Sequence, residues 1–550
     1  MTSMAATRPL IIIRALLLML LPAIIGLAAG AKHANSERDA LRAFQAGVSD
    51  PYGALRSWNS TAHFCRWAGV TCTQGHVTSL NVSGFGVTGM ISPAVGNLTY
   101  LEKLNLDYNR LSGSIPVTLG CLRRLSFLSF FFTGGLGMKI PDSLRNCTSL
   151  KYVYIVNNAL VGPIPDWLGT LPNLTYLWLI GNSFSCEIPS SLSNLTKLQS
   201  LSLYWNHLEG IVPVGLSQLP SLVEFEVGMN LLYGEIPMGF FDMPFLEDLS
   251  LMYNAFHGRL PPDAGTHVPQ LRILRLDSNN LSGLIPASLA SATSLSSLSL
   301  WNNSFTGQMP PEMGTLCPYE LDLSDNKLTA TDDDGGWEFL HRLTNCSKPI
   351  KGTLKRRTHP KLDLSGNRLR GTMPIIIGNL PRQLASLDLS NNLISGTVPP
   401  SIGNLVMLEQ LFLDSNLLTG GIPEEVGNLK NLTYLNLNGN KITGPIPSSI
   451  GNLTELQHLV LNNNTLSGPI PSYIGNLAKP AAACSQQQRV EWTDSSYSSQ
   501  PPAAEPARPL RQHAHGAHSV RNLRPAILVI GNGLVPHNKL DGAHRARPVP

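Results

Sequence analysis

The chain has 550 residues, of which 43% are hydrophobic and 14% are charged, and its formal net charge is +4 at pH 7. From residue 480 onward, eight Lys or Arg residues stand against four Asp or Glu residues, which accounts for the whole excess of positive charge. The rest of the chain is neutral, which argues against nucleic acid as a partner, and its apolar content is enough for a large core.

Residues 1–30 have the layout of a secretory signal peptide. Arg8 precedes an apolar run from Leu10 to Leu21 that Arg14 interrupts once, and small residues follow. This predicts cleavage near residue 30 and entry into the secretory pathway, with the mature protein extracellular or at the outer face of the plasma membrane. The alternative is an uncleaved anchor, but the run is shorter than the ~20 apolar residues that a membrane span needs.

Residues 36–76 predict a helical cap with a disulfide. Three apolar residues fall at helical spacing, namely Leu41, Phe44 and Val48. The sequence C-R-W-A-G-V-T-C follows, and in a secreted chain the nearby Cys65 and Cys72 predict a disulfide rather than a catalytic dithiol, which would need C-x-x-C. A cap is needed here because the first coil of a repeat stack has no preceding neighbour.

Blocks of about 24 residues repeat over 77–317 and again over 362–479. The last three blocks begin at Leu408, Leu432 and Leu456 and align without a gap, with Leu, Asn, Gly, Ile-Pro and Gly-Asn-Leu at fixed offsets. A frame of L-x-x-L-x-L-x-x-N-x-L with this period is the leucine-rich-repeat signature.

The block at 432–455 shows the role of each repeated position. Leu435 and Leu437 lie two residues apart, so both point to the inner side of a short strand. Asn440 follows at the turn, where a side-chain amide can satisfy the backbone groups of neighbouring turns. Pro447 excludes an α-helix through that point. One coil cannot bury these leucines alone but stacked coils share a core, so we expect an α/β repeat solenoid with a parallel β-sheet.

The repeat pattern is disturbed over 318–361 and vanishes over 480–550. The first segment holds an acidic stretch at 332–334, which lacks the spacing of an EF-hand and favours a solvated loop over a calcium site. Residues 348–361 are basic and lack the inward leucines, which indicates an exposed insertion or an incorrectly joined exon. The second segment is rich in Ala, Pro, Ser, Arg and His and is expected to be a disordered low-complexity tail. We find no apolar run after the repeats that is long enough to span a membrane.

The inward leucines also fix which strand positions face outward, because side chains alternate along a strand. In a coil that starts at residue i, positions i+2, i+4 and i+6 line the concave face. Aromatic and Met side chains occupy many of these positions, namely Phe127, Phe131, Tyr152, Tyr154, Tyr176, Trp178, Tyr204, Met252 and Trp301. The neighbouring edge offset adds Phe132, Trp205, Met229 and Tyr253.

This predicts a contiguous aromatic stripe that binds a peptide or protein ligand, since aromatic residues anchor interfaces. The alternative is that the rings pack on each other and only stabilise the sheet. Nearby acidic residues favour basic groups on the ligand, namely Glu224, Glu226, Glu247 and Asp248. The coils from 384 onward are expected to be polar instead, with Ser386, Asp388, Ser390, Asn436, Asn438 and Asn462 on this face.

No catalytic constellation is present, so we expect surface recognition rather than an enzyme, with no cofactor and no metal. The histidines are scattered over different repeat positions, and neither G-x-S-x-G nor H-E-x-x-H occurs. The remaining repeat-region cysteines lie in different coils and are expected to be buried thiols rather than bridges, namely Cys121, Cys147, Cys186, Cys317 and Cys346.

Glycosylation sequons are frequent, partly because the repeated G-N-L-T word is itself a sequon. The expected acceptors, on outer turns, are Asn59, Asn81, Asn97, Asn146, Asn173, Asn194, Asn280, Asn345, Asn431, Asn452 and Asn463. Asn302, beside Trp301 on the concave face, is the exception and is expected to stay unoccupied if the ligand lies there.

Residues 36–479 resemble the ectodomain of plant leucine-rich-repeat receptor-like kinases. The cap has the same helix, Trp-Asn and C-x-W-x-G-V-x-C order, and the coils share G-x-I-P. The island with W-E-F-L and N-C-S resembles the subfamily of the flagellin and elongation-factor receptors. The resemblance implies a right-handed superhelix with a second short strand on one flank. It also implies perception of a microbial or endogenous peptide in immune or developmental signalling, with a co-receptor at the C-terminal coils.

Two departures from that family are expected from the sequence, because neither a transmembrane helix nor a kinase follows the repeats. The chain then corresponds to a truncated receptor or to a soluble decoy. A secreted inhibitor of a pathogen cell-wall hydrolase, of the polygalacturonase-inhibitor type, is the alternative. That family typically has a second cysteine cap after its last coil, whereas only Cys484 follows the repeats here.

Overall fold

The computed structural model describes residues 36–330, 337–346, 360–469, 527–529 and 539–541. The predicted signal peptide, the acidic stretch at 332–334 and most of the basic insertion lie outside these residues. The chain divides into two compact units, of which the first ends at His257 and the second begins at Gly258. Each unit is therefore described by itself.

Unit 1 opens with the cap that the sequence predicts. Residues 36–46 are helical, and the Cys65–Cys72 disulfide is present. Val48 does not continue the helix as predicted, because it begins β1 (Val48–Ser49), which pairs antiparallel with β4 (Thr88–Met90). The short elements that follow are η1 (Arg56–Asn59), η2 (Phe64–Arg66) and β2 (Val70–Thr73).

Two buried tryptophans form the centre of the cap. The rings of Trp58 and Trp67 are stacked with centroids 5.5 Å apart, and Trp58 Nε1 donates to the carbonyl of Ala68 at 2.8 Å. Strand β2 then pairs antiparallel with β3 (His76–Asn81), the first strand of the repeats. The cap thereby covers the end of the first coil, whose Val77 and Leu80 are buried.

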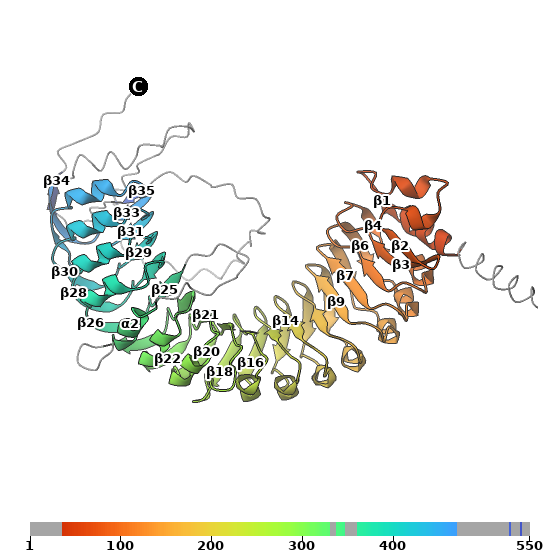
Figure 1. Ribbon diagram of the computed structural model, residues 1–550, viewed down its shortest axis with the longest axis horizontal. Coiled ribbons are helices and arrows are strands. Elements are labelled where there is room, and N and C mark those ends of the chain that lie inside the picture. The colour runs from red at the N-terminus through yellow and green to blue at the C-terminus, as the bar shows by residue number, and fades with distance from the viewer. Residues whose placement is uncertain (1–35, 331–336, 347–359, 470–526, 530–538, 542–550) are drawn as a thin grey trace, which may run out of the picture. The chain divides into compact units, whose positions relative to one another are not determined.

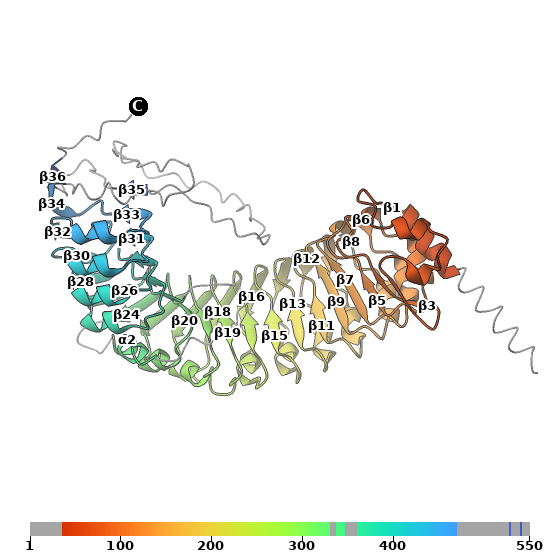
Figure 2. The same ribbon diagram turned by 45° about the horizontal axis from the view of Figure 1, so that its top comes forward.

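Each coil of unit 1 contributes one strand to a first parallel sheet and one strand to a second sheet (Figures 1 and 2). After β3, the first sheet consists of β5 (Lys103–Asn105), β7 (Phe127–Phe131), β9 (Tyr152–Val156), β11 (Tyr176–Trp178), β13 (Ser200–Ser202), β15 (Glu224–Glu226) and β17 (Asp248–Ser250). After β4, the second sheet consists of β6 (Arg110–Ser114), β8 (Gly134–Met138), β10 (Ala159–Pro163), β12 (Ser183–Cys186), β14 (His207–Gly210), β16 (Leu231–Glu235) and β18 (Ala255–Arg259).

The helical segments of these coils are 3-10 helices rather than α-helices. The proline of the Ile-Pro word precedes them and fixes the extended backbone from which they start, as Pro189 does before η7. Those of unit 1 are η3 (Pro93–Asn97), η4 (Val117–Cys121), η5 (Asp142–Asn146), η6 (Asp166–Thr170), η7 (Ser190–Asn194), η8 (Val214–Gln218) and η9 (Met238–Asp242). The predicted repeat solenoid with a parallel sheet is confirmed.

Unit 2 repeats the arrangement. Its first sheet consists of β19 (Ile273–Arg275), β21 (Ser297–Ser299), β23 (Glu320–Asp322), β25 (Lys361–Asp363), β27 (Ser386–Asp388), β29 (Gln410–Phe412), β31 (Tyr434–Asn436) and β33 (His458–Val460). Its second row consists of β20 (Asn280–Leu284), β22 (Ser304–Gln308), β24 (Lys327–Ala330), β26 (Arg368–Thr372), β28 (Leu393–Thr397), β30 (Leu417–Thr419), β32 (Thr443–Gly444) and β34 (Thr465–Pro469). The 3-10 helices are η10 (Ala287–Ser291), η11 (Pro311–Thr315), η12 (Ile375–Asn379), η13 (Pro400–Asn404), η14 (Glu424–Asn428) and η15 (Ser448–Asn452).

A ladder of buried asparagines joins consecutive coils, which confirms the role predicted for the repeated Asn. Asn440 shows the pattern: its Nδ2 donates to Leu437 O at 3.2 Å in its own coil and to Leu413 O at 3.0 Å in the preceding coil. Its Oδ1 accepts from the backbone N–H of Leu418 at 3.0 Å. Each such side chain therefore satisfies backbone groups of two coils at a buried turn.

The irregular segment of unit 2 differs from the prediction in two ways. Cys317 and Cys346, expected to be thiols, form a disulfide with Cα atoms 5.5 Å apart. The bridge is possible because α2 (Glu338–Leu343) packs against η11 and brings Cys346 back to the preceding coil. Lys361, placed in the basic insertion, belongs to β25 and pairs with Asp322 and Asp363 at 2.9 and 3.0 Å.

Within residues 480–550, for which disorder is predicted, the structure describes two short strands. β35 (Ile527–Val529) pairs parallel with β33, and β36 (Lys539–Asp541) pairs parallel with β34. Both strands continue the sheets because the ends of β33 and β34 offer free backbone groups to the next chain segment. Among the described residues, no helix is long and apolar enough to cross a membrane.

Candidate functional site

The aromatic residues predicted for the concave face of unit 1 lie where the alternation places them. Strands β7, β9 and β11 pair in register, so Phe127, Tyr152 and Tyr176 form one row, and Tyr154 and Trp178 form the next. All five side chains are partly buried, while the leucines between them are fully buried.

Six aromatic side chains on these strands pack on one another. We name them the ring cluster, which comprises Phe127, Phe131, Tyr152, Tyr154, Tyr176 and Trp178. Tyr152 stacks on Tyr176 with ring centroids 5.3 Å apart, and Tyr154 lies 4.9 Å from Trp178. Phe131 lies 6.5 Å from Trp178 in an edge-on arrangement. The packing expected from the alternative interpretation is therefore present, yet the cluster keeps part of its surface open on the concave face.

The edge offset has an unusual backbone. Phe132, Trp205, Met229 and Tyr253 all have positive φ angles, between 49° and 58°. The same offset is left-handed in other coils, where Asn157, Gly181 and Ser278 occupy it, so the conformation belongs to the repeat turn, although bulky side chains rarely adopt it. Tyr108 occupies the same offset with φ 52°, and its ring stacks on that of Phe132 with centroids 5.8 Å apart. It was not among the residues predicted from the sequence. Applying the same offset to the coil that starts at Leu101 identifies it.

Beyond Trp178 the concave face becomes polar and then acidic, so the predicted stripe is not continuously aromatic. Trp178 Nε1 donates to Ser200 Oγ at 2.7 Å, and Ser200 Oγ donates to a carboxylate oxygen of Glu224. Tyr204 follows at the end of β13, and its hydroxyl lies 2.8 Å from Met229 Sδ. The ring cluster and the acidic region are thus joined by hydrogen bonds across two strands.

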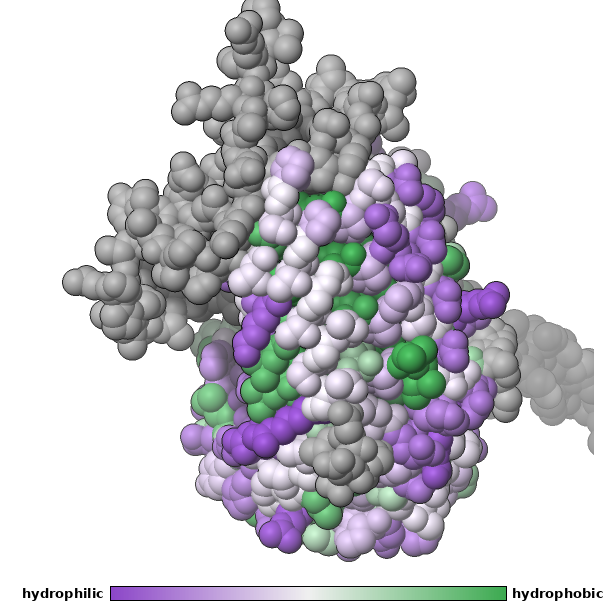
Figure 3. All heavy atoms as spheres, turned by 90° about the vertical axis from the view of Figure 1, so that its left-hand side faces the viewer, coloured by the Kyte–Doolittle hydropathy of each residue, from purple (hydrophilic) through white to green (hydrophobic). Residues whose placement is uncertain are grey.

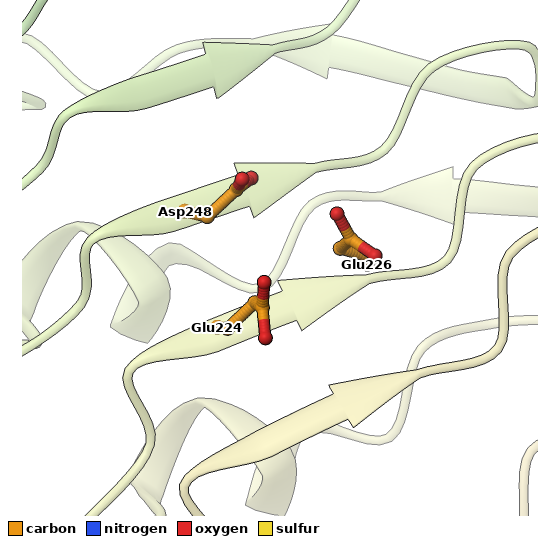
Figure 4. A group of neighbouring side chains, drawn as sticks. All are labelled: Glu224, Glu226 and Asp248. Atoms are coloured by element: carbon orange, nitrogen blue, oxygen red, sulfur yellow. The ribbon is translucent and has the colours of Figure 1, made fainter. Parts of the chain in front are cut away.

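Three carboxyl groups converge in this acidic region (Figure 4). Glu224 and Glu226 project from β15 and Asp248 from β17, and one oxygen of each lies within 4.8 Å of the others. Ser202 Oγ donates to Glu226 at 2.8 Å. Like charges this close favour a cation between them, either a hard metal ion or a Lys or Arg side chain.

The same charges act on the neighbouring phenol. Burial, followed by the nearby Tyr176, Tyr152 and Glu224, raises the pKa of Tyr154 to about 12. The hydroxyl therefore stays protonated at any physiological pH and offers a hydrogen-bond donor beside the carboxylates.

The concave face of unit 2 has two features that bear on the predictions. Trp301 lies here rather than in unit 1, and its Nε1 donates to Asp325 at 2.9 Å. The C-terminal coils are not purely polar as predicted, because Tyr434 stacks on His458 with ring centroids 4.7 Å apart and Phe412 lies tilted against Tyr434 at 4.9 Å. These three residues occupy the same concave-face offsets that identified the ring cluster.

A column of aspartates also follows this face. Asp322, Asp363 and Asp388 are neighbours in register, and Lys361 pairs with the first two. Asp388 accepts instead from the N–H and hydroxyl of Ser390 at 2.9 and 2.7 Å. Burial, followed by the adjacent Asp363, raises the pKa of Asp388 to about 6.

This raised pKa predicts a pH-dependent stability. The folded state binds a proton on Asp388 more tightly than the unfolded chain does, so its stabilising effect is present below about pH 4 and lost as the pH rises through about 6. Asp388→Asn should therefore raise the free energy of unfolding by about 2 kcal/mol at about pH 7.5 and leave it nearly unchanged at about pH 4. Denaturant titrations at the two pH values measure the difference.

Glu425→Gln is the matched control, since it also removes one carboxylate but on an exposed side of η14. Its effect should be small and equal at both pH values. A pH-independent gain in the Asp388 variant would contradict the assignment.

Most predicted sequon asparagines are exposed, with Asn173 only partly so. Asn97, Asn146, Asn194 and Asn452 occupy the last position of η3, η5, η7 and η15. Three acceptors are not on outer turns as predicted. Asn280 is the first residue of β20 in the second row of unit 2. Asn81 lies in β3 of the first sheet, and Asn463 has φ 53° at the same edge offset as Asn302, where its Nδ2 donates to Asn438.

Of the other cysteines, only Cys147 is the buried thiol that was predicted. Its burial, followed by the nearby Cys121, raises its pKa to about 11, so it stays an uncharged thiol. Cys121 and Cys186 are exposed, because they are the last residues of η4 and of β12 and do not occupy core positions.

Stacked coils with inward leucines, an asparagine ladder and a parallel concave sheet define the leucine-rich-repeat class. The leucine rich repeat N-terminal domain family matches residues 34–73, and a leucine rich repeat family matches 360–418. Seven single leucine rich repeats match at 100–122, 173–195, 197–219, 270–292, 294–316, 431–453 and 455–477. The chain belongs to the leucine-rich-repeat proteins with this N-terminal domain, and its relatives are plant leucine-rich-repeat receptor kinases.

One such relative is the LRR receptor-like serine/threonine-protein kinase EFR of Arabidopsis thaliana, which is 43% identical over 95 residues. That match covers 16% of this chain and only 9% of the kinase. The solved LRR ectodomain of the Arabidopsis receptor kinase HAESA, in complex with an N-terminally extended IDA peptide hormone ligand, matches this chain with a TM-score of 0.63 at 27% identity. The match covers 81% of this chain and 88% of that chain. The plant peptide hormone receptor RGFR1 in complex with RGF2 gives a TM-score of 0.55 at 30% identity over 71% of each chain.

Proposed function

We propose that this chain is an extracellular recognition protein of the receptor type that binds an extended peptide on the concave face of unit 1. The observation that supports this proposal is the ring cluster, whose side chains are partly exposed on the concave sheet. The three converging carboxylates lie farther along the same sheet. Aromatic surfaces anchor apolar side chains and the carboxylates attract Lys or Arg. The HAESA and RGFR1 structures, described as complexes with peptide hormones, support the same class of ligand.

The direction of the site also favours an extended ligand. The rows run across successive strands, so a peptide that crosses them meets the rings on β7, β9 and β11 and then the carboxylates on β15 and β17. A ligand with apolar or aromatic residues at one end and a basic residue toward the other matches that order. A receptor in plant immune or developmental signalling would present this surface outside the cell, with glycans at exposed sequons away from the ring cluster.

We also place a second contact, for a co-receptor, at the C-terminal coils. The stacked Phe412, Tyr434 and His458 give these coils an aromatic surface of their own. In this proposal, unit 1 selects the ligand and unit 2 supplies the surface that a partner recognises once the ligand is bound.

A binding selection tests the ligand site. The secreted full-length chain is immobilised and used to select from a displayed library of random dodecapeptides, and the affinities of selected peptides are then measured by calorimetry. Trp178→Ala combined with Tyr204→Ala should weaken binding by about 30-fold or more, because central aromatic anchors each contribute about 2 kcal/mol.

Tyr52→Ala is the control, since this tyrosine is 74% exposed and lies in the cap. Its affinities should equal those of the wild type. Circular dichroism checks that the double variant is folded, and Trp178→Phe retains the ring packing if it is not. Unchanged affinity in folded Trp178 and Tyr204 variants would rule out this site.

A further inference from the structure

A second apolar surface lies on unit 1 away from the ring cluster. Five large side chains on two neighbouring coils are each between 52% and 61% exposed. They lie at the end of β14, on β16 and at the first positions of η8 and η9. We name them the flank patch, which comprises Ile211, Val214, Leu231, Tyr233 and Met238.

The flank patch is continuous across the two coils. β14 and β16 pair parallel with Glu209 opposite Leu231, so their outward side chains form adjacent rows. On β16, Leu231 and Tyr233 point outward while Leu232 is buried. The side chain of Ile211 lies over Gly234, with Cγ2 2.9 Å from the place a Cβ would occupy, and so beside Tyr233. Neither the leucine core nor the concave face uses these side chains.

Apolar exposure is concentrated here beyond what scattered surface residues produce. Among the described residues, 21 large hydrophobic side chains are exposed, and five of them form the flank patch on two neighbouring coils. Contiguous exposed apolar surface on a soluble protein marks an interaction site. The repeat does not require an apolar residue at the position of Ile211, because the equivalent positions in the two neighbouring coils are charged, namely Glu187 and Glu235.

The charge of the same coils indicates what covers the flank patch. Between Lys197 and Arg259 the sequence contains seven Asp or Glu residues and no Lys or Arg. Two of the acidic residues, Glu209 and Glu235, are exposed on the outward face of β14 and β16 beside the apolar side chains. An acidic rim around an apolar centre favours a partner of opposite charge and repels a like one.

We propose that the flank patch is a docking surface for a protein segment that presents apolar side chains together with Lys or Arg. The apolar centre supplies affinity, and Glu209 and Glu235 select the positive charge. A second copy of this chain fits less well, because two identical patches would bring the same carboxylates together. The surface is separate from the proposed peptide site, since its residues lie on β16, after β14 and at the starts of η8 and η9, and none of them lies on a strand of the first sheet.

The test uses two variants of the secreted full-length chain. Ile211→Ser with Tyr233→Ser removes the apolar centre, and Glu209→Gln with Glu235→Gln removes the charge of the rim. All four side chains are exposed, so folding should be unaffected, and thermal melts check this. Displayed random dodecapeptides are selected on the Trp178→Ala, Tyr204→Ala chain, which leaves the flank patch intact and disables the concave site.

The selected peptides should contain Lys or Arg beside apolar residues and should lose about tenfold or more in affinity for either variant. Added salt should weaken binding to the intact patch and have little effect on the Gln variant. Peptides that bind both variants as well as the intact chain, or that carry no positive charge, would overturn the proposal. So would sedimentation showing a dimer of the wild type that the Ser variant abolishes, because the patch would then belong to a second copy.

Discussion

Replacing Asn206 with leucine should lower the free energy of unfolding by about 4 kcal/mol, because it leaves several buried backbone groups without a partner. Asn206 is buried, and its Nδ2 donates to Leu179 O at 2.9 Å and to Leu203 O at 3.0 Å. Its Oδ1 accepts from the N–H of Phe184 at 3.1 Å. Leucine keeps the branched shape and the number of side-chain heavy atoms, so no cavity forms, and the loss reports the hydrogen bonds together with the extra room that its methyl groups need.

Hydrogen exchange followed by mass spectrometry measures this effect coil by coil. In a stack where each coil contacts only its neighbours, faster exchange should be confined to the coils on either side of residue 206. Asn404→Leu is the control, because this asparagine ends η13 and is exposed. Equal protection in the Asn206 variant and the wild type would show that the ladder does not hold the coils together.

The fold was largely predictable because each repeated position acts within one or two coils. The two-residue spacing of Leu435 and Leu437 places both inside a strand, and Asn440 satisfies a turn that every coil must make. The same alternation placed Tyr152 and Trp178 on the concave face. Local rules sufficed there, since a period of 24 brings equivalent residues into register.

Features that depend on the neighbouring coil were harder to predict. The Cys317–Cys346 bridge spans 29 residues and requires α2 to return the chain to the preceding coil, which no local pattern shows. Tyr108 was missed because its left-handed backbone favours Asn or Gly, as Asn391 and Gly439 show at the same offset. The flank patch was missed because the repeat frame assigns no role to outward residues of the second sheet.

The asparagine ladder also bears on the proposed function. A peptide site loses affinity when its residues must be ordered on binding. The ring cluster sits on strands whose turns are held by Asn158, Asn182 and Asn206. The rings are therefore held in place before a ligand arrives, and the concave face can recognise side-chain spacing.

Replacing Gly169 with alanine should destabilise unit 1 by about 3 kcal/mol or more, because the added methyl group has no space. A Cβ on Gly169 would lie 2.2 Å from the carbonyl oxygen of Ser191 in the next coil, and backbone atoms cannot move aside as a side chain can. Gly169, which occupies the position of the glycine in the repeated Gly-Asn-Leu word, thus lets neighbouring 3-10 helices approach. The same approach occurs at Gly96, Gly120, Gly378, Gly403 and Gly427.

Gly137→Ala is the matched control, since a Cβ there meets its nearest atom at an ordinary 3.6 Å and this glycine lies in a strand. It should be tolerated within about 0.5 kcal/mol. Urea titrations of both variants, followed by hydrogen exchange around η6 and η7, measure the two effects. If Gly169→Ala proved as stable as Gly137→Ala, then close helix approach would not be what the repeated glycine provides. The spacing of the strands, and with it the spacing of the rings on β7, β9 and β11, would then depend on the leucines and asparagines alone.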